Sequence, residues 1–356
     1  MNEPVVGQRL YLPLREWPQA DRDAWESLFV DGDVFDGAGP ARHWADATRR
    51  TNRQHYARWL GWLRNAGRLD ASVCPWQRIE PEAVSCYVRL LHATVGSVTL
   101  ASSLVGLKVV AKAMQPEADW RWLARISNRL GAMAEPRDRR DDLLPSSAAL
   151  FDSARTELVR LDLTPLSRRL ERVAYRDTLM VLVLAAAPVR LRNLAGLQLD
   201  RHLLRRNGGW DLRIPENETK NGQRLLYRLP DEVDGPIRTY VERVRPSFMP
   251  EPDCATLWVT FEGVPMVAHS IYCRIDLVTK RLFGQAVNPH RFRAAAATTL
   301  VEAAPEQARL ASALLGHRYF RTTERYYVRA DQIVASRKVH AVLADVRQQT
   351  AKKRRP

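Results

Sequence analysis

The sequence is poor in cysteine, and the few cysteines that it has are scattered. Cys74, Cys86, Cys254 and Cys273 include no pair at the spacing of metal ligands. The cysteine spacing therefore predicts no metal site. We also expect no cofactor, and we expect the thiols to be reduced. The chain also shows no internal repeat and no low-complexity segment, which excludes repeat architectures.

Long hydrophobic runs are absent too. The longest, from Leu179 to Val189, has eleven residues, whereas a membrane-spanning helix needs about 20. The run therefore predicts a buried helix. The N-terminal residues lack a basic region followed by an apolar core, so the sequence predicts no secretory signal. We expect a soluble, cytoplasmic protein with no membrane partner.

Acidic residues are in the minority except at the start of the chain. The formal net charge of the 356 residues is +15, with a pI near 10.1, and a charge of this sign indicates a polyanionic partner. Residues 1–47 carry nine acidic and four basic side chains, which leaves +20 on residues 48–356. The first 47 residues form an acidic leader of unknown role and a poor candidate for an additional DNA-binding module.

The segment 314–330, LLGHRYFRTTERYYVRA, carries the most informative pattern. It places His317 nine residues before Tyr326, and HRFR, with His290 and Arg293, lies upstream. A tyrosine is a poor nucleophile at neutral pH because its phenol titrates near ~10. A protein that uses one to attack a phosphate must surround the site with cations. Two histidines and an arginine in a basic C-terminal segment meet part of that need.

The order and spacing of these residues resemble the C-terminal signature of the tyrosine recombinase, or phage integrase, family. The nine-residue spacing from His317 selects Tyr326 as the nucleophile, with Tyr327 as its rival. The resemblance implies a mainly α protein with a small β-sheet (α+β). It also implies a two-domain DNA clamp, in which a helical core-binding domain precedes the catalytic domain.

The family has a further arginine after a buried helix. Here LMVLVLAAAPVR ends at Pro188, which can stop a helix, and Arg190 opens a second helix. Arg192 is a rival, but spacing favours Arg190. The family usually has Thr-Gly before this arginine and Glu three residues after it. This chain has Ala-Pro and Asn193 there, and Asn193 cannot supply a carboxylate.

The family also has a lysine on a β-hairpin between the two arginines. The segment 210–229 predicts this hairpin, with alternating Trp210, Leu212 and Ile214, an Asn221-Gly222 turn signal, and a second strand. Lys220 directly precedes the turn and is the only lysine of the hairpin. We therefore assign the lysine role to Lys220.

The chain divides near residue 140. Residues 135–147, with two prolines and no periodicity, predict a linker between a helical core-binding (SAM-like) domain at 48–134 and a catalytic domain at 148–331. Apolar spacing predicts a helix around Tyr56–Leu63, capped by Thr51 and stopped by Gly67. It predicts three more helices, after Pro81, at about 99–114 and at about 118–130. In these helices the candidates for phosphate contacts are Arg49, Arg50, Arg53 and Lys108, although each could equally lie on a solvated face.

The last segment, 332–356, predicts a C-terminal helix followed by a basic tail. Val339, Val342, Leu343 and Val346 share one helical stripe. In the family such a helix often docks on a neighbouring protomer, which would build a tetramer on DNA. Packing on its own domain is the alternative.

The resemblance implies the chemistry of a DNA strand transferase that needs neither metal nor ATP. Arg190, Arg293 and His317 would hold the scissile phosphate, and His290 would assist proton transfer from Tyr326. The tyrosine would attack phosphorus to give a 3′-phosphotyrosyl bond, and Lys220 would protonate the leaving 5′-oxygen. The implied partners are a specific site on double-stranded DNA, further copies of the chain and accessory or sister recombinases. We expect the protein to serve a mobile genetic element and to be associated with the nucleoid in the cytoplasm.

Two other functions use related machinery. A type IB topoisomerase shares the tyrosine chemistry but relaxes supercoils as a monomer. A non-catalytic DNA-binding relative would have lost some of the catalytic residues, whereas this chain has all six. The linker, the helical N-terminal half and the C-terminal stripe favour the recombinase over the topoisomerase.

Overall fold

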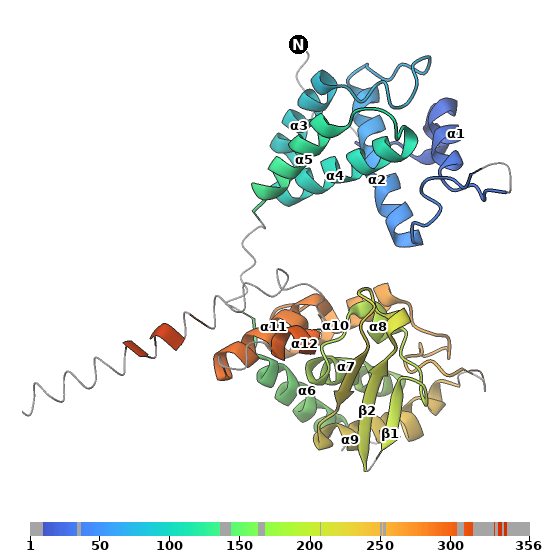
Figure 1. Cartoon of the computed structure of the whole chain (residues 1–356). Helices are drawn as coiled ribbons and strands as arrows, with labels where there is room; N and C mark the ends of the chain where they lie inside the picture. Colours follow the sequence, from blue (N-terminus) through green and yellow to red (C-terminus); the bar gives the residue numbers. More distant parts are fainter. Residues whose placement is uncertain are drawn as a thin grey trace, which may run out of the picture. The chain divides into compact units, whose positions relative to one another are not determined.

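The structure is a computed structural model of the chain (Figure 1). It describes residues 10–33, 37–135, 144–162, 168–206, 208–249, 251, 254–304 and 310–315, and isolated residues from 331 to 339. The chain forms two compact units, residues 1–139 and 140–356. Each unit has its own hydrophobic core and is described by itself.

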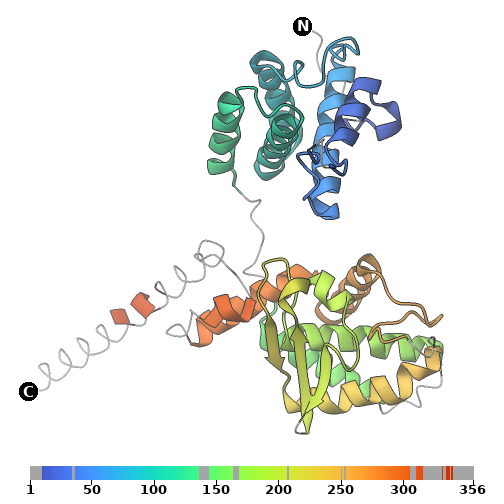
Figure 2. The same ribbon diagram turned by 45° about the vertical axis from the view of Figure 1, so that its right-hand side comes forward.

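The first unit is helical in its described residues (Figures 1 and 2). Its elements are η1 (Leu14–Glu16), α1 (Gln19–Ser27), α2 (Asp46–Asn65), α3 (Pro81–Thr94), α4 (Ser97–Met114) and α5 (Arg121–Ala132). The four helices that apolar spacing predicts are therefore confirmed as α2 to α5. By length and hydropathy α4 is the one described helix that could cross a membrane. Its buried residues, including Leu104 and Leu107, pack in the core of this unit.

The predicted start of α2 is wrong and its predicted stop is confirmed. The helix begins at Asp46, and Thr51 lies inside it with its hydroxyl donating to the carbonyl of Ala47 at 2.9 Å. A threonine can serve the backbone in this way within a helix as well as at a cap. The helix ends at Asn65, and Gly67 adopts a φ of +65° that glycine accommodates without strain.

The acidic leader contributes to the core of the first unit. Leu12, Trp17, Trp25 and Leu28 are buried in the same cluster as the aromatic residues of α2. The leader also lies against the backbone of α2, because a Cβ at Gly61 would come within 2.2 Å of the Leu10 carbonyl oxygen. A large apolar contribution from the leader therefore stabilises the α2 region.

A buried acid from the leader joins two other segments. The Asp21 side chain is fully buried, accepts a 2.6 Å hydrogen bond from the Tyr56 hydroxyl and pairs with the Arg78 guanidinium. Burial, and then the charge of Asp21, raise the pKa of Tyr56 well above its usual value. This acidic residue thus has a structural partner for its charge, as buried carboxylates require.

In its described residues the second unit is mainly helical with one small sheet (Figure 2), which confirms the predicted fold class. Its long helices are α6 (Ser147–Asp162), α7 (Arg169–Ala186), α10 (Ala268–Phe283) and α11 (Pro289–Ala303). Its shorter elements are α8 (Leu191–Ala195), η3 (Glu216–Glu218), η4 (Asp231–Val233), α9 (Asp234–Thr239), η5 (Tyr240–Val244), η6 (Pro246–Phe248) and α12 (Leu310–Leu315).

Helix α7 is the centre of this unit. It is buried on all sides from Tyr175 to Ala185, and it contacts α6, α10 and α11. A helix that is apolar all round must be enclosed, and this one contains residues 179–186 of the apolar run that predicts a buried helix. The helix ends at Ala186, before Pro188, as expected.

The sheet is antiparallel, with the order β1 (Leu203–Arg206), β2 (Gly209–Ile214) and β3 (Leu225–Arg228). Strands β2 and β3 confirm the predicted hairpin, but the connection is longer than a tight turn. Ile214 pairs with Leu225, so residues 215–224 form a loop that contains η3 and ends in the turn at Gly222, whose φ is +65°. Strand β1 was not predicted, because Leu-Leu-Arg-Arg has no alternating pattern.

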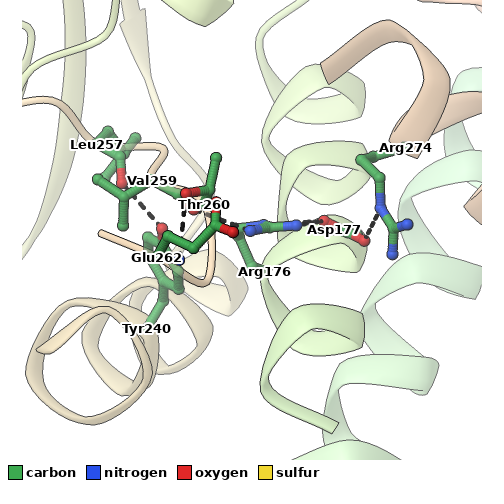
Figure 3. A network of polar contacts seen from close by, with 8 residues as sticks. All are labelled: Arg176, Asp177, Tyr240, Leu257, Val259, Thr260, Glu262 and Arg274. Carbon is green, nitrogen blue, oxygen red and sulfur yellow. Dashed lines mark hydrogen bonds and ion pairs between the residues drawn. The ribbon is translucent and has the colours of Figure 1, made fainter. Parts of the chain in front are cut away.

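A buried ionic network joins α7 to α10 and to the segment after η6 (Figure 3). Asp177 accepts two hydrogen bonds from Arg176, at 2.9 and 2.7 Å, and one from Arg274 at 2.5 Å. Arg176 also donates to the carbonyl of Val259 at 2.9 Å. Asp177 is only 1% exposed and Arg176 only 3%, so each charge depends on the others for its solvation.

We predict that Asp177→Ala strongly destabilises the second unit. The substitution leaves the buried Arg176 guanidinium without its counter-charge, which typically costs about 3–5 kcal/mol. Asp152, exposed on α6, provides the matched control, and Asp152→Ala should change stability by no more than about 0.5 kcal/mol. Urea unfolding of the full chain measures both. Equal effects of the two substitutions would show that the buried network adds little.

Candidate active site

Arg190 lies where the sequence predicts it. Helix α7 ends at Ala186, the chain passes through Pro188, and Arg190 is the N-cap residue of α8 in an extended conformation. Its side chain is partly buried, whereas Arg192 is exposed. Only one of the two rival arginines is therefore packed into the second unit.

Arg293 joins the α7–α8 turn to the end of α12. It is on α11 and is 4% exposed. Its Nη1 donates to the carbonyl of Pro188, two residues before Arg190, and its Nη2 donates to the carbonyl of Leu315. A buried guanidinium needs such acceptors to offset its loss of hydration. These bonds join α11 to two other segments. Pro188 lies 105 residues from Arg293 in the sequence, and Leu315 lies 22 residues from it.

Tyr227 connects the sheet to the end of α12. Its hydroxyl, on β3, donates to the carbonyl of Leu314 at 2.6 Å. Burial raises the pKa of this hydroxyl, and the positive charges of Arg293 and Arg190 partly oppose the rise. Arg293 itself bonds to the carbonyl of Pro188, two residues before Arg190, so the two arginines belong to neighbouring segments. Arginines from neighbouring segments can together form a site for a phosphate.

His290 begins the helix that carries Arg293. It is the second residue of α11, after Pro289, and it is exposed. The Asn288 side chain caps this helix by accepting the Arg291 N–H at 3.3 Å. Residues three apart share a helix face, so His290 and Arg293 lie one above the other at the end where the helix dipole favours anions.

Lys220 is exposed in the loop between β2 and β3. This loop is hydrogen-bonded to α8, because the Asn193 amide donates to the carbonyl of Glu218 at 3.0 Å. Asn193 takes the place of the glutamate that the family usually has, and it uses a donor group that a carboxylate lacks. Sequence reasoning missed this contact and the role of Tyr227. Alternation along β3 places Tyr227 inward, but no sequence signal identifies Leu314 as its partner.

Two predicted residues lie outside the described part of the chain. They are His317 and Tyr326, and the rival Tyr327 is also outside it. The described chain reaches Leu315, two residues before His317, and there it meets Arg293 and Tyr227. The structure thus joins Arg293 to the turn before Arg190 and to Leu315, the first residue of the Leu-Gly-His segment. Of the apolar C-terminal stripe only Val339 is described, and it is 55% exposed.

The four candidates for phosphate contacts differ in exposure. Arg50 is exposed, while Arg53 and Lys108 are partly buried. Arg49 donates to the carbonyls of Trp44 and Arg42, and its guanidinium lies 4.4 Å from the centre of the Phe29 ring. These contacts give Arg49 a structural role in the first unit.

The described residues contain no group of three or more His, Cys, Asp or Glu side chains that could hold a metal ion.

The fold and site define a class of protein with a helical N-terminal unit and a C-terminal α+β unit that clusters arginines. Comparison with known proteins identifies this class. Residues 161–332 match the family described as "Phage integrase family". These residues therefore belong to the phage integrase, or tyrosine recombinase, family.

One curated relative is the tyrosine recombinase XerD of Staphylococcus saprophyticus subsp. saprophyticus. It is 27% identical over 154 residues, which cover 43% of this chain and 50% of the relative. The chain thus spans about half the length of the curated relative that it matches.

Two solved structures share the fold. The pre-cleavage complex of the XerH site-specific recombinase with a difH substrate has a TM-score of 0.55 at 14% identity, covering 81% of this chain and 78% of XerH. The post-cleavage complex of XerH with a palindromic difH substrate has a TM-score of 0.56 at 13% identity, covering 84% and 81%. At such identities the likeness concerns the fold.

We predict that Tyr227→Phe loosens α12. The substitution leaves the Leu314 carbonyl without its donor at a partly buried position, which should cost about 1–3 kcal/mol of local stability. Hydrogen exchange in a peptide that covers 310–315 should therefore become faster. Tyr272→Phe removes the hydroxyl of an exposed tyrosine on α10 and should leave this peptide unchanged. Unaltered exchange in the Tyr227 variant would contradict the assignment of this hydrogen bond.

Proposed function

We propose that the chain is a site-specific DNA recombinase that cuts and rejoins duplex DNA through a 3′-phosphotyrosyl intermediate. The observation that carries the proposal is the buried Arg293, which joins the carbonyl two residues before Arg190 to the end of α12 in a domain of the tyrosine recombinase family. The fold likeness to XerH in complex with a DNA substrate supports DNA as the partner. The charge of +20 on residues 48–356 suits that partner.

The arginines stabilise the reacting phosphate. Their planar forks suit the two non-bridging oxygens, whose charge grows in the transition state. Arg293 reaches this position already oriented by the carbonyls of Pro188 and Leu315. Preorganised donors cost little reorganisation when the reaction occurs. His317 donates to the same phosphate, and His290 takes part in removing the phenolic proton.

Bond making and bond breaking balance without an external energy source. The Tyr326 oxygen attacks phosphorus in line, and the bond from phosphorus to the 5′-oxygen breaks. Lys220 gives a proton to that leaving oxygen. Because the phosphotyrosyl bond retains the energy of the phosphodiester, a 5′-hydroxyl from a second duplex can reverse the step. Two rounds of exchange recombine two sites.

The assembly that we propose follows the domain order of the chain. A helical core-binding domain at 48–134 and a catalytic domain at 148–331, joined by the linker 135–147, close around the duplex as a clamp. The helix within 332–356 joins four copies into a tetramer on DNA, with accessory or sister recombinases where two different sites are joined. We place the reaction in the cytoplasm, in the service of a mobile genetic element.

We predict that Tyr326→Phe abolishes covalent attachment to DNA and preserves DNA binding. Sequencing DNA ends that are covalently bound to the wild-type protein first locates the cleavage site. A duplex nicked beside that site should then trap a denaturant-resistant complex with the wild type and with the Tyr327→Phe variant. The Tyr326→Phe variant lacks the attacking oxygen and should give no complex. The reverse result for the two variants would move the nucleophile by one residue.

We predict that a better leaving group rescues Lys220→Ala. General-acid assistance contributes a factor of about 10²–10⁴, and a 5′-bridging phosphorothiolate needs little of it. The variant should be slow on normal DNA and nearly normal on the thiolate substrate. Arg190→Ala and Arg293→Ala should remain slow on both, because charge on the non-bridging oxygens still needs them. Equal rescue of all three would remove the general-acid role from Lys220.

A further inference from the structure

The loop that carries Lys220 has no apolar anchor of its own. In the described loop 215–224 no residue is buried. A cavity of about 170 Å³ lies beside it, lined in part by Arg192, Asn193, His202 and Glu218. Packing therefore does not fix the loop at this side. Its position depends on polar contacts.

Three such contacts meet at Glu218. The Asn193 side chain, 8% exposed on α8, donates to the backbone carbonyl of Glu218 at 3.0 Å. The Glu218 carboxylate lies 3.0 Å from Nε2 of His202, which is 3% exposed, and it also pairs with Arg201. Nδ1 of His202 accepts the Gln198 N–H at 3.1 Å, so in the neutral ring Nε2 is the nitrogen that carries the proton.

Only Thr219 separates Glu218 from Lys220 in the chain. Thr219 donates its backbone N–H to the carbonyl of Glu216 at 3.1 Å, and its hydroxyl accepts the Gln223 N–H at 2.9 Å. These bonds close the loop on itself around Lys220. A displacement of Glu218 must therefore displace Lys220 as well.

We propose that Asn193 and Glu218 are positioning residues that hold Lys220 where it can protonate the leaving 5′-oxygen. The inference rests on the proposed function, in which Lys220 is the general acid. Asn193 lies three residues after Arg190, on the helix α8 that Arg190 caps. Its bond to Glu218 therefore ties the lysine loop to the helix that begins at the phosphate-binding arginine. An amide is required at 193, because a carboxylate cannot donate to the Glu218 carbonyl.

The test compares cleavage rates on two substrates. These are the mapped cleavage-site duplex and the same duplex with a 5′-bridging phosphorothiolate at the scissile position. Misplacement of a catalytic group by about 1 Å can cost 10²-fold, so Asn193→Ala should slow cleavage of the normal duplex by about 10- to 100-fold. On the thiolate duplex it should cleave at close to the wild-type rate. A purely structural role would slow both substrates alike.

Matched variants sharpen the comparison. Asn193→Asp keeps the shape and removes the donor, so it should behave like Asn193→Ala. Asn217→Ala truncates an exposed amide in the same loop and should cleave both substrates normally. If Asn193 variants fold poorly in a melting experiment, Glu218→Gln weakens the second contact and should show a smaller defect with the same rescue.

A double variant tests whether Asn193 acts through Lys220. Asn193→Ala combined with Lys220→Ala should be no slower on the normal duplex than Lys220→Ala alone, because both changes remove the same assistance. An additive loss would overturn the proposal. So would an Asn193→Ala defect that the thiolate does not rescue, or a normal rate on the normal duplex. If Lys220→Ala itself is not rescued, the general-acid assignment fails, and that outcome is separate from a failure of Asn193 alone.

Discussion

The buried guanidinium of Arg293 is the contact on which the site depends. It binds the carbonyl of Pro188 before α8 and the carbonyl of Leu315 at the end of α12, and so connects the turn before Arg190 to α12. Tyr227 adds the sheet to this junction through the neighbouring carbonyl of Leu314. A guanidinium suits this place because its planar fork can serve several acceptors at once. The second unit thus assembles part of a phosphate site before any phosphate is bound.

Other contacts of the second unit support the chain around that junction. The enclosed helix α7, which contains the buried Arg176–Asp177 pair, ends just before the turn at Pro188. Asn193 ties the lysine loop to α8, and the Glu218 carboxylate of this loop pairs with His202 and Arg201. The groups thought to act on the non-bridging oxygens and on the leaving oxygen are therefore positioned by separate contacts. This separation is the reason that a change of leaving group can tell them apart.

The sequence predicts features that depend on local pattern and misses those that depend on distant partners. Spacing identifies α2 to α5, the buried run of α7, the hairpin strands, and Arg190 at the start of a helix. It places the start of α2 wrongly, because Thr51 bonds to Ala47 inside the helix. It gives no sign that the acidic leader is buried against α2 through Trp17 and Asp21. It also cannot show that Asn193 replaces a family glutamate by donating to a carbonyl 25 residues away. The roles of His317 and Tyr326 remain predictions from spacing.

In the proposed reaction a tyrosine of this chain becomes joined to a 3′-phosphate of DNA. The most direct measurement is mass spectrometry of the peptide that remains attached to DNA after a trapped complex is digested with protease and nuclease. If Tyr326 is the nucleophile, a single nucleotide-linked peptide is expected, with the link on Tyr326 and a 3′-phosphate as the attached group. A link through a 5′-phosphate, a link on another residue, or a cleaved duplex with no attached peptide would contradict it.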